Sequence, residues 1–136
     1  MPELSTARLY ALRAMYLFMF AGLAATIWPL ILNPPPDLQH MRGVVWSLLT
    51  ALSLLSALGI RYPIAMLPLL FFELAWKVIW VGLIGYPLWA AGALDAAHQE
   101  TWYSCLMGVV LVPLVIPWGY VWTNYVKAPG NRWRRA

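Results

Sequence analysis

The chain has 136 residues, of which 62% are hydrophobic and only 10% are charged, and its mean hydropathy is +0.69. About 25% of the residues of an ordinary soluble domain are charged, so this composition excludes that class and indicates a protein of the lipid bilayer. A spanning helix needs about 20 apolar residues, which leaves room for four spans and for no separate soluble domain. We therefore expect one all-α domain over residues 1–136, a polytopic four-transmembrane-helix bundle.

The net charge of +4 is better explained by membrane topology than by nucleic-acid binding. Cations dominate one side of the expected spans, and acidic residues dominate the other. The positive-inside rule then places both termini in the cytoplasm, and we expect the inner (plasma) membrane of a bacterium. The basic C-terminal tail is expected to lie on anionic headgroups. The cations of the first side are Arg8, Arg13, Arg61, Lys127, Arg132, Arg134 and Arg135, and the other side holds Asp37, Asp95 and Glu100 with Arg42 as its only cation.

The first two spans are expected at about 9–32 and 41–60. The first apolar run is too long and too bulky for a cleaved signal peptide, so we interpret it as a retained helix that ends at Asn33-Pro34-Pro35-Pro36. The second span carries a stripe of hydroxyl side chains, which is typical of a face that packs against other helices. These residues are Ser47, Thr50, Ser53 and Ser56.

The third span is expected at about 62–85, between Tyr62-Pro63 and Gly85-Tyr86-Pro87, and is followed by an interfacial segment at 88–94. The fourth is expected at about 101–125. Pro113 and Pro117 lie in its middle, so we expect a kink, with free carbonyls near Val109 and Pro113 that need partners. Cys105 in this span is the only cysteine of the chain, which excludes an internal disulfide, a CxxC redox pair and a thiolate metal cage.

A weak internal repeat relates the two halves of the chain. Pro29-Leu30, Asp37 and His40 recur at an offset of 58 residues as Pro87-Leu88, Asp95 and His98. If the repeat is real, the protein consists of two repeated helical hairpins, and its two Asp-x-x-His turns lie together on the outer face. The alternative is a chance similarity between two hairpins.

An acidic and a basic residue, Glu73 and Lys77, lie within the third apolar segment. A charge at the bilayer centre costs at least about 2.5–3.5 kcal/mol, so we interpret these residues, with Trp76 and Trp80, as an intramembrane polar centre. The four-residue spacing places the charges on one helical face, where they can pair. If the helix spans 62–85 they flank its centre, whereas in the register of the repeat Lys77 is central. The pair is either a protonatable centre that a proton, a cation or an anionic headgroup can open, or a self-satisfied contact that fixes packing or recruits a partner helix.

A second candidate site is an outer-face cluster of carboxylates and imidazoles. Two facing Asp-x-x-His turns could bind Zn²⁺, Cu²⁺ or Fe²⁺, with His40 and His98 as candidate metal ligands, and bis-histidine haem ligation is a remoter alternative. Helix capping by the aspartates explains the same spacing, and it is the interpretation that we favour. No cofactor is expected. The cluster comprises Asp37, His40, Asp95, His98 and Glu100.

Three functions follow from these candidates. The first is a small oligomeric transporter or permease-like unit built on the Glu73–Lys77 centre, in which the kinked fourth helix moves. The second is an accessory or assembly subunit of a membrane complex, in which the two charges pair with a partner protein. The third is a membrane enzyme or redox unit that uses the outer-face cluster. The expected partners are the lipid bilayer and either further copies of the chain or another membrane protein, without nucleic acid.

Overall fold

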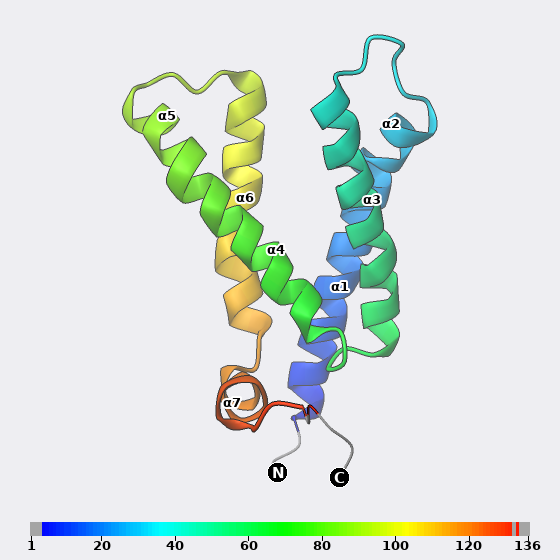
Figure 1. Cartoon of the computed structure of the whole chain (residues 1–136), viewed down its shortest axis with the longest axis vertical. Helices are drawn as coiled ribbons and strands as arrows, with labels where there is room; N and C mark the ends of the chain where they lie inside the picture. Colours follow the sequence, from blue (N-terminus) through cyan, green and yellow to red (C-terminus); the bar gives the residue numbers. More distant parts are fainter. Residues whose placement is uncertain (1–3, 132, 134–136) are drawn as a thin grey trace.

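The computed structural model describes residues 4–131 and 133, and all regular structure in this part of the chain is helical. Four long helices form two antiparallel hairpins (Figure 1). The first hairpin consists of α1 (Thr6–Thr26) and α3 (His40–Arg61), and the second of α4 (Leu67–Trp80) and α6 (Ala96–Val115). A short helix with proline in its first turn precedes the loop of each hairpin, α2 (Trp28–Leu32) in the first and α5 (Tyr86–Ala90) in the second.

Three of the described helical segments are long and apolar enough to cross a membrane, namely Thr6–Thr26, His40–Arg61 and Leu67–Ala90. A fourth is obtained if α6 and the segment Trp118–Lys127 form one broken span. The expectation of an all-α protein with helices suited to membrane insertion is therefore confirmed. The bilayer that holds them and their orientation in it stay predictions.

The third helix has other bounds than the sequence predicted. It begins at Leu67 rather than near Tyr62, because Pro68 lacks the amide donor that a helix continuing from Tyr62 would need. It then runs to Ala90, so Pro87 does not end it. The turn before Pro87 widens into a π-helix, η1 (Val81–Gly85), whose last hydrogen bond joins the Tyr86 N–H to the Val81 carbonyl. In a π-helical turn each N–H bonds to the carbonyl five residues back rather than four. Here that turn lies directly before Pro87, which has no N–H to donate.

Two consequences follow from these bounds. Residues 88–90 continue the helix, so only 91–94 of the predicted segment 88–94 are non-helical, and its interfacial position stays a prediction. Lys77 lies near the middle of the 24-residue helix Leu67–Ala90, and Glu73 lies one turn closer to its start, which is the register that the repeat predicted.

The fourth span is broken into two helices rather than kinked within one. α6 begins at Ala96, five residues before the expected start, and contains Pro113 without a break. It ends before Pro117, and α7 (Trp118–Val121) with the π-helix η2 (Trp122–Lys127) then continues at 75° to it. The indole N–H of Trp118 donates to the Pro113 carbonyl at 2.8 Å, so one of the carbonyls expected to need a partner has one.

The first helix is also interrupted. It ends at Thr26, and Ile27 separates it from α2. The second span, α3, agrees closely with the predicted 41–60. Its hydroxyl stripe faces α1 only in the second half of the helix: Ser53 and Ser56 are buried, whereas Ser47 is exposed. The Ser53 hydroxyl donates across to the Phe20 carbonyl of α1 at 3.0 Å.

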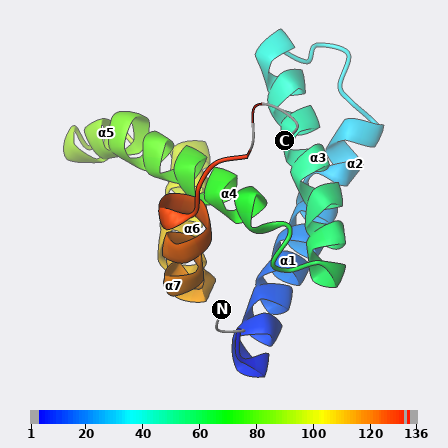
Figure 2. The same ribbon diagram turned by 60° about the horizontal axis from the view of Figure 1, so that its bottom comes forward.

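Among the described residues, the hairpins meet along the half of α1 that runs from its start to Tyr16. There the fully buried Tyr16 donates its hydroxyl to the Pro63 carbonyl at 2.9 Å, and Arg8 of α1 donates to the Leu114 carbonyl of α6 at 2.7 Å. From this base the hairpins diverge toward their loops (Figures 1 and 2). The four helices therefore do not enclose one core along their whole length. The core residues are Leu12, Met15, Tyr16, Met19, Leu52, Leu67, Leu70, Val112 and Ile116.

Two cationic groups of the sequence analysis are placed as follows. Arg13 donates its Nε–H to the Ile60 carbonyl at the end of α3, at 3.0 Å. Arg132, Arg134 and Arg135 of the basic tail lie outside the described residues, so the expected contact of the tail with headgroups stays a prediction.

Candidate functional site: a cleft above an ion pair

Glu73 and Lys77 form an ion pair on α4, with 2.5 Å between Oε1 and Nζ. Only 4% of Glu73 and 9% of Lys77 are exposed, so the structure withdraws both charges from its surroundings. The indole N–H of Trp76 donates to the other carboxylate oxygen at 3.2 Å, and the ammonium lies 5.5 Å from the centroid of the Trp76 ring. Both oxygens of Glu73 are thus engaged by side chains of its own helix. A lysine ammonium has three N–H donors, so the pair leaves Lys77 with donor capacity to spare.

A glycine of the neighbouring helix makes room for the lysine. A Cβ atom built on Gly108 of α6 would lie 2.6 Å from both Cδ and Nζ of Lys77. Such a separation is shorter than van der Waals contact, so any larger residue at this position must displace the end of the lysine side chain. Gly108 therefore allows Lys77 to lie between α4 and α6 with its ammonium on Glu73.

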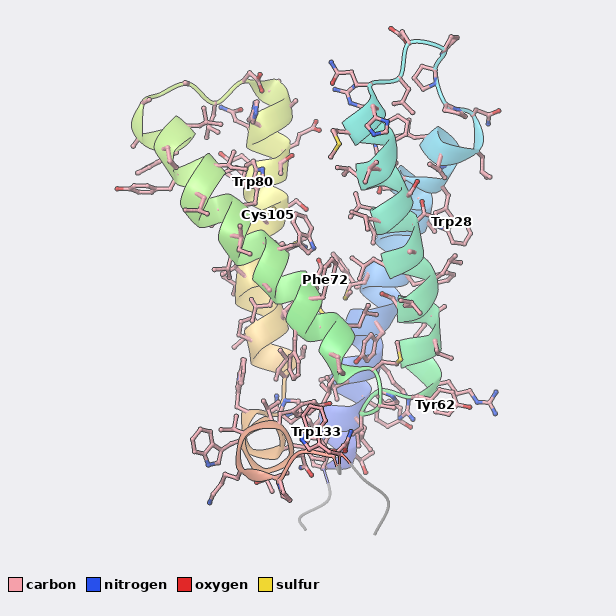
Figure 3. The ribbon with its side chains drawn as sticks, in the orientation of Figure 1. Trp28, Tyr62, Phe72, Trp80, Cys105 and Trp133 are labelled. Atoms are coloured by element: carbon pink, nitrogen blue, oxygen red, sulfur yellow. The ribbon has the colours of Figure 1, made fainter. Side chains whose placement is uncertain are left out.

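The ion pair lies at the edge of a cleft between the two hairpins, with a volume of about 630 Å³. Cavities of about 300–1,000 Å³ are typical of small-molecule sites. From the loops toward the base, the second hairpin places Trp80 highest, then Cys105, then Phe72 (Figure 3). The cleft is lined by Leu23, Thr26, Ile27, Val45, Leu48, Leu49, Leu52, Phe72, Glu73, Trp76, Lys77, Trp80, Glu100, Thr101, Ser104 and Cys105.

The two walls of this cleft differ in chemistry. The wall from α1 and α3 is apolar except for Thr26. The wall from α4 and α6 carries the ion pair, both tryptophans of the predicted polar centre, and a row of polar residues on α6. In this row Glu100 and Ser104 are exposed, and Thr101 is half-buried. At 1.5 Å per residue, the row runs for about 12 Å from Glu100 to the level of Gly108, where Lys77 lies.

The outer-face cluster is not assembled. Asp95 and His98 form a pair within one hairpin, with 2.8 Å between Oδ1 and Nδ1, while His40 lies at the start of α3 in the other. Among residues 4–131 and 133, no group of three or more His, Cys, Asp or Glu side chains is placed to hold a metal ion. The expected meeting of the two turns is absent from this part of the chain because the hairpins diverge at their loop ends.

The two aspartates also differ in their role at the helix starts. Asp95 is the N-cap of α6, and its carboxylate accepts the backbone N–H of His98 at 2.8 Å. This bond, together with the side-chain bond to His98, lowers the pKa of Asp95 below its ordinary value. The cap of α3 is Gln39, and it makes no side-chain capping bond. The capping interpretation therefore holds for Asp95 and fails for Asp37.

No family model, curated protein or solved structure matches the chain. The chemistry of the site must therefore be inferred from its own residues.

The structure brings together all four residues of the predicted polar centre and adds Glu100 from the outer-face set. It also adds three residues that sequence reasoning missed, Thr101, Ser104 and Gly108. Their spacing of three and four residues in an otherwise apolar segment places them on one face of a helix, and this signal could have identified them.

Proposed function

We propose that the protein is a small transporter or permease-like unit of a membrane, and that the cleft between the hairpins is its solute-binding site. The observation that carries the proposal is that a cleft of ligand size reaches a buried, ionisable pair. A pair retained only for packing would be replaced by apolar residues at little or no cost in stability, whereas access from a cleft gives the charges a chemical use. Membrane-embedded ionisable residues commonly mark solute or ion pathways.

The shape of the molecule supports the same proposal. The hairpins contact each other at the base and diverge toward the loops, so solute enters from the loop side, which positive-inside topology assigns to the outer face (Figure 1). Opening this site to the cytoplasm requires rearrangement at the base, which Tyr16 and Arg8 hold closed here. Oligomers of the chain would shield the sides of the cleft from lipid.

The test is thiol accessibility in sealed vesicles of known orientation, in a Cys105→Ser background. Ser104→Cys places a thiol on the cleft wall, and Val110→Cys places a matched thiol on an exposed apolar position of the same helix outside the cleft. A charged, membrane-impermeant thiosulfonate reacts only with thiols that water reaches. We expect it to label position 104 from both sides of the membrane, faster from the loop side, and to spare position 110.

Each other result contradicts part of the proposal. Labelling of position 104 from the loop side alone would refute transport and leave a one-sided binding protein. Absence of labelling from both sides, with full reactivity after denaturation, would refute a water-filled site and favour the accessory subunit. Equal labelling at 104 and 110 would show that this part of α6 is not in lipid.

A further inference from the structure

We propose that the ligand of the cleft is an amphiphile with a zwitterionic headgroup, one that joins an ammonium to a phosphate or carboxylate and carries a hydrocarbon chain. This inference rests on the proposed function, because it requires the cleft to be a binding site, and it names the chemical class that binds there.

Charge balance is the first reason. Glu73 and Lys77 are a neutral pair with little exposure, and they already satisfy each other. A ligand of net charge that opens the pair leaves one uncompensated charge in a low-dielectric site, which is strongly unfavourable. A zwitterion avoids this penalty, because its anion takes the ammonium of Lys77 while its cation takes the carboxylate of Glu73. The net charge of the site then stays the same before and after binding.

The hydrogen-bonding groups around the pair fit such a headgroup. The spare donors of Lys77 and the hydroxyl of Ser104 suit the oxygens of a phosphate or carboxylate. The ring faces of Trp76 and Trp80 suit an ammonium through cation–π contact, as the position of the Lys77 ammonium near Trp76 already illustrates. Glu100 adds a carboxylate nearer the loops, where it attracts the cationic end of an approaching ligand.

The opposite wall gives the reason for the hydrocarbon chain. It consists almost entirely of aliphatic side chains from α1 and α3 and faces the polar wall across the cleft. A small polar zwitterion would leave this wall without a partner, whereas an amphiphile covers both walls at once. Burial of apolar area then adds to binding in proportion to the area covered.

The experiment is native mass spectrometry of the full-length protein in a nonionic detergent, titrated with four probes. Three are short-chain amphiphiles of equal chain length: a phosphoethanolamine lipid, an anionic phosphoglycerol lipid and a cationic alkylammonium. The fourth is glycerophosphoethanolamine, which has the same net-neutral headgroup as a phosphodiester but no hydrocarbon chains. We expect the zwitterionic lipid to bind at least about tenfold more tightly than each of the others.

Variants of the pair sharpen the test, because each removes one charge. Glu73→Gln should shift the preference to the anionic lipid, Lys77→Met should shift it to the cationic amphiphile, and the double variant should bind all three equally. Asp95→Asn, which removes a carboxylate outside the cleft, should leave the parent preference unchanged.

The inference is refuted if either singly charged amphiphile binds the parent protein as tightly as the zwitterion, or if the preferences of the single variants do not invert. Equal binding of glycerophosphoethanolamine would refute the amphiphile and retain the zwitterion. These outcomes can be told apart from those that test the proposed function. Position 104 can be labelled from both sides although the zwitterionic lipid does not bind preferentially. Conversely, the zwitterionic lipid can bind to a protein whose site never opens to the cytoplasm.

Discussion

Removing one member of the Glu73–Lys77 pair should destabilise the protein far more than removing both. At 2.5 Å and an effective dielectric constant of about 20, the attraction between the two charges is about 6–7 kcal/mol before the cost of burying them is subtracted. The withdrawal of both groups from water offsets much of this attraction in the pair. In a single variant the remaining charge still bears the cost of burial but has no partner to attract it. Such single changes cost about 3–5 kcal/mol.

The substitutions can be chosen to change charge with little change in shape. Glu73→Gln keeps an oxygen that can accept the Trp76 indole N–H, and Lys77→Met keeps most of the aliphatic side chain that packs over Gly108. We expect each single variant to lose about 3–5 kcal/mol of unfolding free energy, and the double variant to recover to within about 1 kcal/mol of the parent.

The assay is reversible unfolding in mixed micelles followed by circular dichroism, in a double-mutant cycle with parent, both single variants and the double variant. The reasoning is refuted if the double variant is as unstable as the worse single variant. It is equally refuted if both single variants lie within about 0.5 kcal/mol of the parent, because the charges would then be solvated rather than buried.

Three further predictions concern other parts of the fold. Gly108→Ala should cost about 1–3 kcal/mol in the same unfolding assay, because the new methyl displaces the lysine of the ion pair, whereas Gly22→Ala, whose Cβ meets no atom within 4 Å, should be neutral or stabilising. Tyr16→Phe should cost about 1 kcal/mol by leaving a buried carbonyl without its donor, and a loss below about 0.3 kcal/mol would contradict that hydrogen bond. Because its pKa is lowered in the folded protein, Asp95 stabilises the start of α6 above the pKa of an unfolded aspartate, and this contribution is lost as pH falls through the lower, folded pKa. The protection factor of the His98 amide, which is its exchange rate compared with the intrinsic rate at the same pH, should therefore fall on acidification, and Asp95→Asn should abolish that change.

Local pattern predicted much of the fold. Helix periodicity and apolar length fix which segments become helices, and four-residue spacing fixes the Glu73–Lys77 contact. Proline was less reliable as a boundary: Pro117 interrupts its helix, while Pro113 is accommodated and Pro87 follows a π-helical turn. A partner for the freed carbonyl does not decide the outcome, because the Trp118 indole satisfies the Pro113 carbonyl that Pro117 leaves free, and the helix is interrupted there all the same.

The cleft could not be predicted in the same way. It exists because the two hairpins, over residues 4–131, touch at their base and diverge from there. The angle between them follows from packing around residues such as Tyr16 and Ile116, which are far apart in sequence. The contact of Gly108 with Lys77 likewise joins two helices whose relative register no local pattern specifies. The two Asp-x-x-His turns were expected to meet, and the same angle keeps them apart.

Contact at the base, with the loop ends apart, makes each hairpin a lever arm. The helix Leu67–Ala90 has 24 residues, which corresponds to a length of about 36 Å. A rotation of about 10° at its foot would sweep its tip through about 6 Å. A small change of angle around Tyr16 would thereby be amplified into a large change in the separation of the loop ends.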